Sequence, residues 1–455
     1  MGKYFGTDGI RGVVNAGLDA MLAYKTGQAT AAVLSENKSG RPLICIGKDT
    51  RLSCDMLESA LVAGLCSAGA DVMALGVIPT PAVAYITVDC NADAGIVISA
   101  SHNPFEHNGI KIFNSKGYKL SDELELRIEE LIDNIEEVPL ETEGGIGRVS
   151  WNSGQYKARY LEHIISCAEH DIKRLRIAVD CANGAACTTA EEVFSRFPLD
   201  VTFIGSNPDG VNINEKCGST HIERLSELVV RGKFDLGIAF DGDADRCLVV
   251  DENGSLVDGD KIMAVCATGM KKMGKLSKDA FVATVMSNMG LHEYSRNRDI
   301  HVHTASVGDR NVLEMMQEHE LVLGGEQSGH LIFLNDSTTG DGQLAAVKFL
   351  SVLSESGKKV SELVSEIPTY PQILTNIKIN GGNKVKDELM SDDVIRQAIR
   401  AEEEKLGENG RVLVRPSGTE ALIRVMVEAI REDITNNCSE YLTNLIKERA
   451  ENIFH

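Results

Sequence analysis

Two segments of the sequence place side chains that can carry out phosphoryl chemistry. The stretch 98–104, Ile-Ser-Ala-Ser-His-Asn-Pro, brings a hydroxyl nucleophile, Ser101, out of an apolar run into a polar turn that Pro104 stiffens. Far downstream, the segment 241–246 alternates three carboxylates: Asp241, Asp243 and Asp245. Carboxylates so close together repel one another, and a hard divalent cation relieves that repulsion. A cation beside a serine also neutralises phosphoryl oxygens, so the two segments together predict phosphoryl transfer at Ser101.

Two other families place aspartates at a similar spacing, and the sequence argues against both. Positions 1, 3, 5 and 12 of a calcium-binding EF-hand loop would be Asp241, Asp243, Asp245 and Glu252. An EF-hand needs glycine at position 6, where this chain has Arg246, and the flanks 236–240 and 248–250 resemble strands rather than helices. Haloacid-dehalogenase-like phosphatases also run a strand into an Asp-x-Asp pair, but they carry Thr or Val where Asp245 stands. A cation site with three aspartate ligands is the interpretation we keep.

The residues around Ser101 have both a structural and a chemical interpretation. His102 either donates a hydrogen bond to a phosphate or caps a turn. The Asn-Gly pair 108–109 turns the chain back into the strand-like segment 110–113, where Lys111 points away from its apolar neighbours. Lys111 is then either an exposed strand lysine or a lysine desolvated beside a phosphoserine, where it would stabilise charge or carry a proton.

Two further loops have the composition of ligand sites. The segment 324–330, Gly-Gly-Glu-Gln-Ser-Gly-His, sets acceptors and donors between glycines, which suits vicinal sugar hydroxyls, although an ordinary Gly-rich turn would look the same. The segment 415–420, with Arg424 following, combines an arginine fork, two hydroxyls and a glycine that lets backbone N–H groups form an anion nest. It predicts a phosphate site, with a solvated surface turn as the alternative. The residues of that site are Arg415, Ser417, Gly418, Thr419 and Arg424.

Strand-like and helix-like runs alternate, which is typical of an α/β protein. A strand at 43–46, a helix at 56–68 and a strand at 72–75 form a first unit, and the same order begins again near 175 and near 281. In each unit a candidate loop follows an apolar strand, at the strand end where ligands bind in α/β sheets. The strand-like segments 96–98, 238–240 and 321–323 lead to Ser101, Asp241 and Glu326 respectively. We also expect a helix over 186–197, strands at 411–414 and 422–427, and a closing helix at about 432–446.

Composition limits the class of protein and its partners. A chain of 455 residues that is 43% hydrophobic can form several cores and divides into three or four domains. We expect these domains to span 1–150, 151–254, 255–369 and 370–455. A formal charge of -21 argues against nucleic acid and anionic membranes as partners, so an anionic substrate requires a local cluster of basic residues. Eleven cysteines without a CxxC pair, and an N-terminus without a signal core, predict reduced thiols in a cytoplasmic protein.

Over essentially its whole length the sequence resembles the α-D-phosphohexomutase superfamily. The motifs that carry the resemblance are Gly6–Gly12, Ser99–Pro104, Asp241–Arg246, Gly325–His330 and Arg415–Glu420. The resemblance implies an α/β fold with four domains around a central cleft: three related mixed-sheet α/β units and a smaller C-terminal α+β domain.

The resemblance also implies a role for each candidate residue. Ser101 would carry the phosphoryl group, and its oxygen would complete a single Mg²⁺ site with Asp241, Asp243 and Asp245. Sugar hydroxyls would be bound by Glu326 and Ser328. The phosphate that does not react would be held by Arg415, Ser417, Thr419 and Arg424. The reaction centre would be lined by Arg11, His102, Lys111, Arg246 and His330.

The implied reaction is a mutase reaction on a hexosamine phosphate. Phosphorylated Ser101 gives its group to the sugar, a 1,6-bisphosphate reorients, and the serine recovers the other phosphoryl group. Glucosamine 6-phosphate thereby becomes glucosamine 1-phosphate, which feeds synthesis of UDP-N-acetylglucosamine. Gln327 and the opening segment 3–9 favour the glucosamine branch, with phosphomannomutase or phosphoglucomutase activity as the alternative. A non-catalytic, metal-dependent binding protein is the alternative from another class, and the intact loops argue against it.

The resemblance has further consequences for activation and assembly. Glucosamine or glucose 1,6-bisphosphate would act as activator and intermediate, and the family favours a homodimer. Whether a bisphosphate, an activating kinase or autophosphorylation first loads Ser101 stays open. The chain departs from the family at Ala421, where proline is common, and at Lys48, where arginine is common. Ala421 would loosen the end of the phosphate loop, and neither change removes a reacting group.

Overall fold

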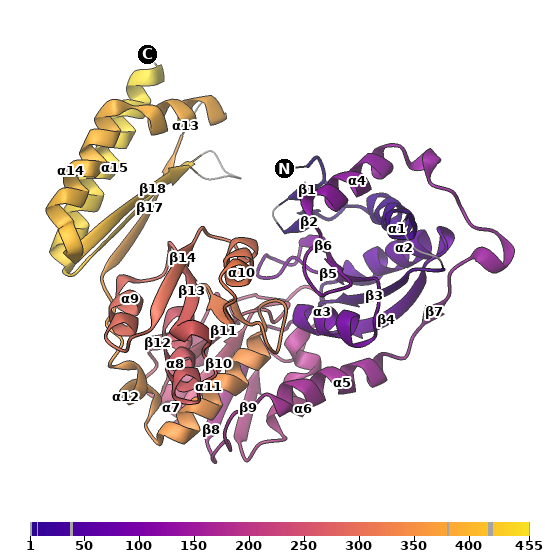
Figure 1. Ribbon diagram of the computed structural model, residues 1–455, viewed down its shortest axis with the longest axis horizontal. Helices are drawn as coiled ribbons and strands as arrows, with labels where there is room; N and C mark the ends of the chain where they lie inside the picture. The colour runs from indigo at the N-terminus through magenta and orange to yellow at the C-terminus, as the bar shows by residue number, and fades with distance from the viewer. Residues whose placement is uncertain (1, 7, 37–39, 380–381, 417–421, 455) are drawn as a thin grey trace. The chain divides into compact units, whose positions relative to one another are not determined.

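The computed structural model describes residues 2–6, 8–36, 40–379, 382–416 and 422–454. Residues 1–286 and 299–366 form one compact unit, and residues 287–298 and 367–455 form a second. Figure 1 shows the helices and strands of both units. Among the described residues, none of the helices combines the length and the apolar character needed to cross a bilayer.

The first sheet has seven strands in the order β1-β2-β6-β5-β3-β4-β7. Its strands are β1 (Phe5–Gly6), β2 (Gly9–Val13), β3 (Leu43–Lys48), β4 (Asp71–Val77), β5 (Ala94–Ile98), β6 (His107–Asn114) and β7 (Val149–Ser150). The accompanying helices are α1 (Ala20–Ser35), α2 (Cys54–Ser67), α3 (Thr80–Asp89), α4 (Asp122–Asp133) and α5 (Ser153–Ser166), with short 3-10 turns η1 (Ile135–Glu137) and η2 (Glu143–Gly145). Apolar side chains of α1, α2 and α4 form one core with those of β3, β5 and β6. On β3, a Cβ at Gly47 would lie 2.4 Å from Val83 of α3, so glycine permits that close packing.

The second and third sheets repeat this mixed pattern. The second has the order β12-β11-β10-β8-β9, and the third has the order β14-β13-β15-β16. The strands of the second are β8 (Arg176–Asp180), β9 (Asp200–Ile204), β10 (Leu236–Phe240), β11 (Cys247–Asp251) and β12 (Leu256–Val257). Those of the third are β13 (Ala280–Thr284), β14 (His301–Ala305), β15 (Leu323–Gly325) and β16 (Leu331–Phe333). The helices and 3-10 turns of this part are η3 (Ala185–Thr188), α6 (Ala190–Phe194), α7 (Glu223–Gly232), α8 (Gly259–Lys272), η4 (Ser277–Asp279), α10 (Asp309–Glu318), α11 (Gly342–Ser356) and α12 (Val360–Val364).

The three sheets share a feature that positions the candidate loops. In each, an antiparallel strand follows the innermost parallel strand along the chain: β6 follows β5, β11 follows β10 and β16 follows β15. The connection between the two strands carries Ser101 in the first sheet, the aspartates in the second and Glu326 in the third. The prediction that each candidate loop follows a strand is therefore confirmed, and the repeat explains why.

The second unit is smaller and has a different construction. Its sheet is antiparallel, in the order β17-β19-β18, with β17 (Gln372–Lys378), β18 (Gly410–Pro416) and β19 (Leu422–Ala429). Its helices are α9 (Met289–Arg296), α13 (Gly382–Ser391), α14 (Asp393–Leu406) and α15 (Glu432–Phe454), with a 3-10 turn η5 (Gly407–Asn409). Three mixed α/β sheets and a smaller α+β unit match the predicted fold class.

Some predicted elements differ from the observed ones. The helix expected over 186–197 is instead the turn η3 followed by the short helix α6, because Thr189 between them has a non-helical φ of -130°. The strand that leads to Glu326, β15, lies at 323–325 rather than at the expected 321–323. The closing helix is longer than expected and continues to Phe454. The domain boundaries at 150, 254 and 369 stay predictions.

Candidate active site

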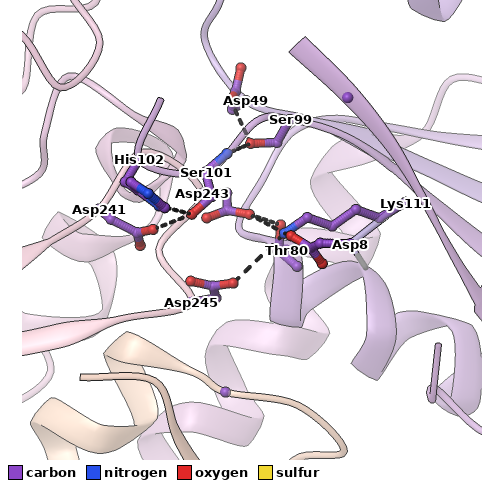
Figure 2. Close-up of polar contacts among 12 residues, drawn as sticks. Asp8, Asp49, Thr80, Ser99, Ser101, His102, Lys111, Asp241, Asp243 and Asp245 are labelled. Carbon is purple, nitrogen blue, oxygen red and sulfur yellow. Dashed lines mark hydrogen bonds and ion pairs between the residues drawn. The ribbon is translucent and has the colours of Figure 1, made fainter. Parts of the chain in front are cut away.

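Ser101 lies in a backbone conformation that few residue types adopt. Its φ is +52°, in the left-handed region, which costs a residue other than glycine about 1–3 kcal/mol. Its backbone N–H donates to the hydroxyl of Ser99 at 2.9 Å, and that hydroxyl donates to Asp49 at 2.6 Å. These buried contacts link Ser101 through Ser99 to Asp49, and Figure 2 shows Ser99 between the other two residues.

Arg51 holds the same loop from the side with its whole guanidinium group. Its Nε pairs with Asp49 at 2.8 Å, and the side chains of both residues are fully buried. Its Nη2 donates to the carbonyl oxygens of Ser101 and Asn103 at 2.8 and 2.9 Å, and its Nη1 donates to those of Pro104 and His107 at 2.5 and 3.1 Å. Asn214, from the second sheet's domain, also donates to the Ser101 carbonyl, at 2.9 Å. Arg51 thus makes most of the side-chain contacts that hold the strained turn in place.

The serine hydroxyl faces the acidic loop. Ser101 is 2% exposed, and its Oγ donates to Oδ2 of Asp241 at 2.7 Å (Figure 2). Nδ1 of His102 lies 3.3 Å from the same Oγ. Burial, followed by the charges of Arg246 and Arg11, lowers the pKa of His102 to about 4, so its imidazole is neutral near pH 7. The two segments that sequence analysis paired are thus in direct contact.

The three aspartates come together as a group of potential metal ligands. One carboxylate oxygen from each of Asp241, Asp243 and Asp245 lies within 4.8 Å of the others, and all three residues are buried. Burial, and after it the charges of Asp245 and Asp243, raises the pKa of Asp241 well above its usual range. Glycine at 242 allows this loop to approach the serine, because a Cβ there would lie 2.5 Å from the Ser101 carbonyl oxygen.

The unpaired oxygens of this loop test whether a cation fits. Oδ1 of Asp243 and Oδ1 of Asp245 are buried and make no hydrogen bond within the described part of the chain. Leaving such charged oxygens unsatisfied is expensive, and a divalent cation with oxygen ligands would satisfy both. The donor set of hard carboxylate oxygens beside a hydroxyl therefore fits Mg²⁺.

Lys111 lies next to two of the three aspartates and to Asp8. Its Nζ lies 3.1 Å from Oδ2 of Asp243, 3.8 Å from Asp245 and 3.3 Å from Asp8, and the side chain is 4% exposed. Although burial disfavours the charge, Asp243 and then Asp8 outweigh it and raise the pKa of Lys111. Lys111 is therefore a buried lysine rather than an exposed one, and its role beside a phosphoserine stays a prediction. Thr80 also contacts Asp243, donating to Oδ2 at 2.7 Å.

Two arginines, Arg11 and Arg246, have buried Nε donors that make no hydrogen bond to the described residues. Arg11 forms an ion pair with Asp8, and Nε of Arg246 lies 3.8 Å from Asp245. Nε donors of this kind suit the oxygens of a phosphoryl group. The local cluster of basic residues that an anionic substrate requires in this acidic chain is therefore present.

His330 belongs to the same centre. Its Nδ1 lies 3.6 Å from Oδ2 of Asp245, and the backbone N–H of Gly340 donates to its Nε2 at 3.1 Å. Burial opposes a charge on the imidazole, but Asp245 outweighs it and raises the pKa to about 9, while the same charges lower the pKa of Asp245. The Gly340 N–H opposes this rise in pKa, because it needs a lone pair on Nε2. In either protonation state Nδ1 is the nitrogen that carries a proton toward Asp245.

The loop between β15 and β16, which is predicted to bind sugar hydroxyls, is held by side-chain contacts and by one backbone contact to β11. Oε1 of Glu326 accepts from the backbone N–H of Gly308 at 3.0 Å, and Nε2 of Gln327 donates to Asp258 at 3.2 Å. The backbone N–H of Cys247 donates to the Gly329 carbonyl at 3.0 Å, which joins this loop to the strand that follows the aspartates. Ser328 at the tip is exposed. Gln327, the residue that favoured the glucosamine branch, therefore anchors the loop.

The phosphate loop is only partly described. Ser417, Gly418, Thr419 and Ala421 lie outside the described residues. Arg415 on β18 and Arg424 on β19 are cross-strand partners in the second unit. Burial and then the charge of Arg424 lower the pKa of Arg415.

Sequence analysis missed several residues that the structure brings to the centre. Asp8 pairs with Lys111, Lys119 and Arg11, and Asp309 pairs with Lys119. Asp8 lay within the N-terminal motif and could have been found there, whereas no local pattern marks Lys119 or Asp309. Lys48, the other departure from the family, pairs with Asp55 and Glu58 at 2.6 and 2.5 Å; these contacts lie within the first sheet's domain.

Comparison with known families gives matches to four consecutive domains. They are described as phosphoglucomutase/phosphomannomutase alpha/beta/alpha domains I, II and III and the C-terminal domain, over residues 2–139, 158–254, 258–370 and 374–444 respectively. Curated relatives include the phosphoglucosamine mutases of Acetivibrio thermocellus, 52% identical, and Clostridium beijerinckii, 50% identical. Each comparison covers 99% of this chain and 100% of the relative.

Solved structures agree with this at the level of the fold. A phosphoglucomutase/phosphomannomutase family protein from Burkholderia thailandensis matches with a TM-score of 0.82 at 22% identity, over 98% of this chain and 97% of that one. Aspergillus fumigatus N-acetylphosphoglucosamine mutase, solved with GlcNAc-6P and magnesium, matches with a TM-score of 0.69 at 17% identity, over 98% and 96%. The same enzyme has been solved with glucose 1,6-bisphosphate.

Proposed function

The chain belongs to the phosphoglucomutase/phosphomannomutase family, and we propose that it is a phosphoglucosamine mutase that interconverts glucosamine 6-phosphate and glucosamine 1-phosphate. It is thus an isomerase that works by phosphoryl transfer. The observation that carries the chemical part of the proposal is the 2.7 Å contact between Ser101 Oγ and Asp241, beside two buried carboxylate oxygens that accept no hydrogen bond from the described residues.

In the mechanism, phosphorylated Ser101 donates its group to a free hydroxyl of the sugar phosphate. The 1,6-bisphosphate that results turns end for end, and Ser101 then takes the phosphoryl group at the other position. Because the transferred group is already anionic, the protein acts mainly by positioning and charge stabilisation. The turn fixed by Arg51 provides the positioning, and the buried Nε donors of Arg11 and Arg246 provide the contacts for phosphoryl oxygens.

The acidic loop defines the metal requirement. Asp241, Asp243 and Asp245 would hold one Mg²⁺ together with an oxygen at Ser101. When bound, the ion would neutralise charge on the phosphoryl oxygens as a Lewis acid. Lys111 would stabilise the same charge from the other side, because its Nζ contacts Asp243 and Asp245. His330 would donate a hydrogen bond from Nδ1 toward Asp245. His102 would accept a hydrogen bond from Ser101 Oγ or donate one to its phosphoryl group.

Substrate binding is assigned to the two other loops. Glu326 and Ser328 would contact sugar hydroxyls. Arg415 and Arg424, together with Ser417, Gly418 and Thr419, would hold the phosphate that does not react. A 1,6-bisphosphate of glucosamine or glucose would load Ser101; loading by a kinase or by autophosphorylation, a homodimeric state and a cytoplasmic location remain part of the proposal. The product would supply synthesis of UDP-N-acetylglucosamine.

A coupled assay tests the proposal directly. The purified chain, with Mg²⁺ and glucose 1,6-bisphosphate, is given the 6-phosphates of glucosamine, glucose and mannose, and formation of each 1-phosphate is measured. We expect the highest kcat/KM with glucosamine 6-phosphate. A clear preference for mannose or glucose phosphate would replace the proposal by phosphomannomutase or phosphoglucomutase activity, and no turnover of any of them would favour the non-catalytic alternative.

The covalent step has its own variant. Ser101→Ala removes the proposed acceptor but no apolar packing, so we expect loss of turnover by at least about 10³-fold with an unchanged unfolding temperature. Ser99→Ala serves as the matched control, because it removes a supporting hydroxyl from the same loop and leaves the nucleophile. It should retain measurable turnover. Near-normal rates in Ser101→Ala would contradict the covalent role.

A further inference from the structure

Lys119 forms a bridge between two carboxylates from distant parts of the chain. Its Nζ lies 2.5 Å from Oδ1 of Asp8 and 2.7 Å from Oδ2 of Asp309, and the side chain is 15% exposed. Asp8 lies in the turn between β1 and β2, and Asp309 is the first residue of α10. The lysine thus joins the domain that carries Ser101 to the domain that carries the sugar-binding loop.

The local fold places Lys119 at this position and keeps it there. Residues 114–119 turn back on β6, with Gly117 at a φ of +76°. The backbone of Lys119 pairs with that of Phe113 in an isolated antiparallel β-bridge. On one side of the lysine, Thr338 donates to the Gly117 carbonyl at 2.8 Å. On the other side, Arg310 donates to the Leu120 carbonyl at 2.6 Å. The segment is therefore tied to the third sheet's domain both before and after Lys119.

The carboxylate Asp8 leads from Lys119 to the reaction centre by one route. It lies 3.3 Å from Nζ of Lys111, which in turn lies 3.1 Å from Asp243 and 3.8 Å from Asp245. Asp8 also pairs with Arg11, whose Nε is one of the unused donors. Figure 2 shows Asp8 and Lys111 side by side next to Asp243 and Asp245.

The carboxylate Asp309 leads to the same centre by a second route. It lies 4.0 Å from Nε2 of His330, whose Nδ1 lies 3.6 Å from Asp245. Burial disfavours the charge of Asp309, and Lys119 is the largest influence that lowers its pKa, while Asp8 acts in the opposite direction. Without the lysine, two carboxylates now within hydrogen-bond distance of one nitrogen would repel each other across a partly buried gap.

We propose that Lys119 is a positioning residue for phosphoryl transfer, which holds Asp8 and Asp309 together and through them sets where Lys111 and His330 stand around Asp245. The inference rests on the proposed mutase function. Lys119 does not touch the reacting atoms, so its effect falls on the geometry in which Lys111 and His330 meet the transferred group. Loss of that geometry lowers the rate of the chemical step more than it weakens substrate binding.

Lys119→Met removes the charge and keeps most of the aliphatic volume. We expect kcat to fall by about tenfold to a hundredfold while KM changes by less than about threefold. Lys119→Arg restores the charge and should recover most of the rate. Lys119 lines a cavity of about 580 Å³, and Lys116 is an exposed lysine that lines the same cavity. Lys116→Met is therefore the matched control and should leave kcat unchanged.

A double variant separates positioning from simple support of the fold. In Lys119→Met the remaining carboxylates repel, so adding Asp309→Asn should raise the rate above that of Lys119→Met alone, although Asp309→Asn by itself lowers it. Thermal unfolding of every variant is measured in parallel. A kcat of Lys119→Met within about twofold of wild type, failure of Lys119→Arg to recover the rate, or a double variant no faster than Lys119→Met would each overturn the inference.

The wild-type assay distinguishes this inference from the proposed function. If the wild-type chain turns over glucosamine 6-phosphate, the variants test Lys119 alone. If it instead prefers glucose or mannose phosphate, the substrate assignment fails, and the same variants, assayed with the preferred sugar phosphate, still decide the role of Lys119. A chain without any mutase turnover would overturn both.

Discussion

Asp243 has two carboxylate oxygens with different surroundings, and the difference defines what the residue can do. Oδ2 accepts from Thr80 and Lys111, whereas Oδ1 is buried without a partner in the described residues. Asp243→Asn keeps the shape but removes the charge that a cation needs. We expect kcat to fall by about 10²-fold or more and the Mg²⁺ concentration for half-maximal rate to rise. Steady-state rates over a magnesium titration check this.

Metal removal from the wild type complements the variant. Chelation should abolish turnover and added Mg²⁺ should restore it, because burial and then the charges of Asp245 and Asp243 disfavour ionised Asp241 unless a cation compensates them. Glu215→Gln, an exposed carboxylate in the same domain, is the control and should respond to Mg²⁺ as the wild type does. Full activity after chelation would contradict the metal assignment.

Single residues could be predicted where a short segment concentrates chemistry. Ser101 and the three aspartates stood out, because a nucleophile or a set of repelling charges is visible within a few residues. Lys119 and Asp309 could not be found in this way, since each is an ordinary charged residue in its own segment. Asp8, the other partner of Lys119, is 111 positions away from it in the sequence, and Asp309 reaches the same lysine only because two domains dock.

At the scale of elements, the loop between β5 and β6 depends on one side chain. Arg51 donates to four backbone carbonyls of that loop, so Arg51→Lys would leave several of them unsatisfied while keeping a positive charge near Asp49. We expect a loss of about 2 kcal/mol or more in the free energy of unfolding, and a lower kcat from a less defined Ser101. Denaturant titration and steady-state kinetics at a temperature where the variant is folded check both effects.

A control shows whether the effect belongs to the loop. Arg176→Lys changes an exposed arginine that pairs with Asp200 and should leave both quantities nearly unchanged. Equal stability and rate in Arg51→Lys and the wild type would show that the left-handed turn at Ser101 needs no such support.

The sequence predicted whether a segment forms a helix or a strand better than it predicted where that element begins and ends. The strands at 43–46 and 422–427 were found because apolar runs of that length are typical of buried strands, and the structure extends them to β3 and β19. The helix over 186–197 failed at Thr189, whose hydroxyl accepts from Gln343 at 2.6 Å. That contact comes from a residue 154 positions later in the chain, so no local pattern could have indicated the interruption.

At the scale of the whole molecule, a chain with a net charge of -21 has to bind an anion. The structure gathers basic side chains at one place in this acidic chain and stabilises their charges with nearby carboxylates. Lys111, for example, lies among Asp8, Asp243 and Asp245. The long-range field therefore disfavours nucleic acids and anionic surfaces, while a small phosphorylated sugar meets the local donors. The sequence predicted that such a cluster must exist, but not which carboxylates would balance it.

The second unit carries the remaining cations, and their arrangement makes a prediction that does not depend on the reaction. Arg415 and Arg424 are cross-strand partners on β18 and β19, and burial and then the charge of Arg424 lower the pKa of Arg415, so the two like charges repel each other. Arg415→Met should therefore leave the unfolding temperature unchanged or raise it, and should reduce the additional stabilisation that inorganic phosphate gives the wild type. If Arg415 holds the substrate phosphate that does not react, as proposed, it contacts that phosphate in both the ground state and the transition state. KM for glucosamine 6-phosphate should then rise by about tenfold or more, with a smaller change in kcat. Arg400→Met, an exposed arginine on α14, is the control for both measurements. If phosphate stabilised Arg415→Met as much as the wild type, the second unit would bind its anion elsewhere.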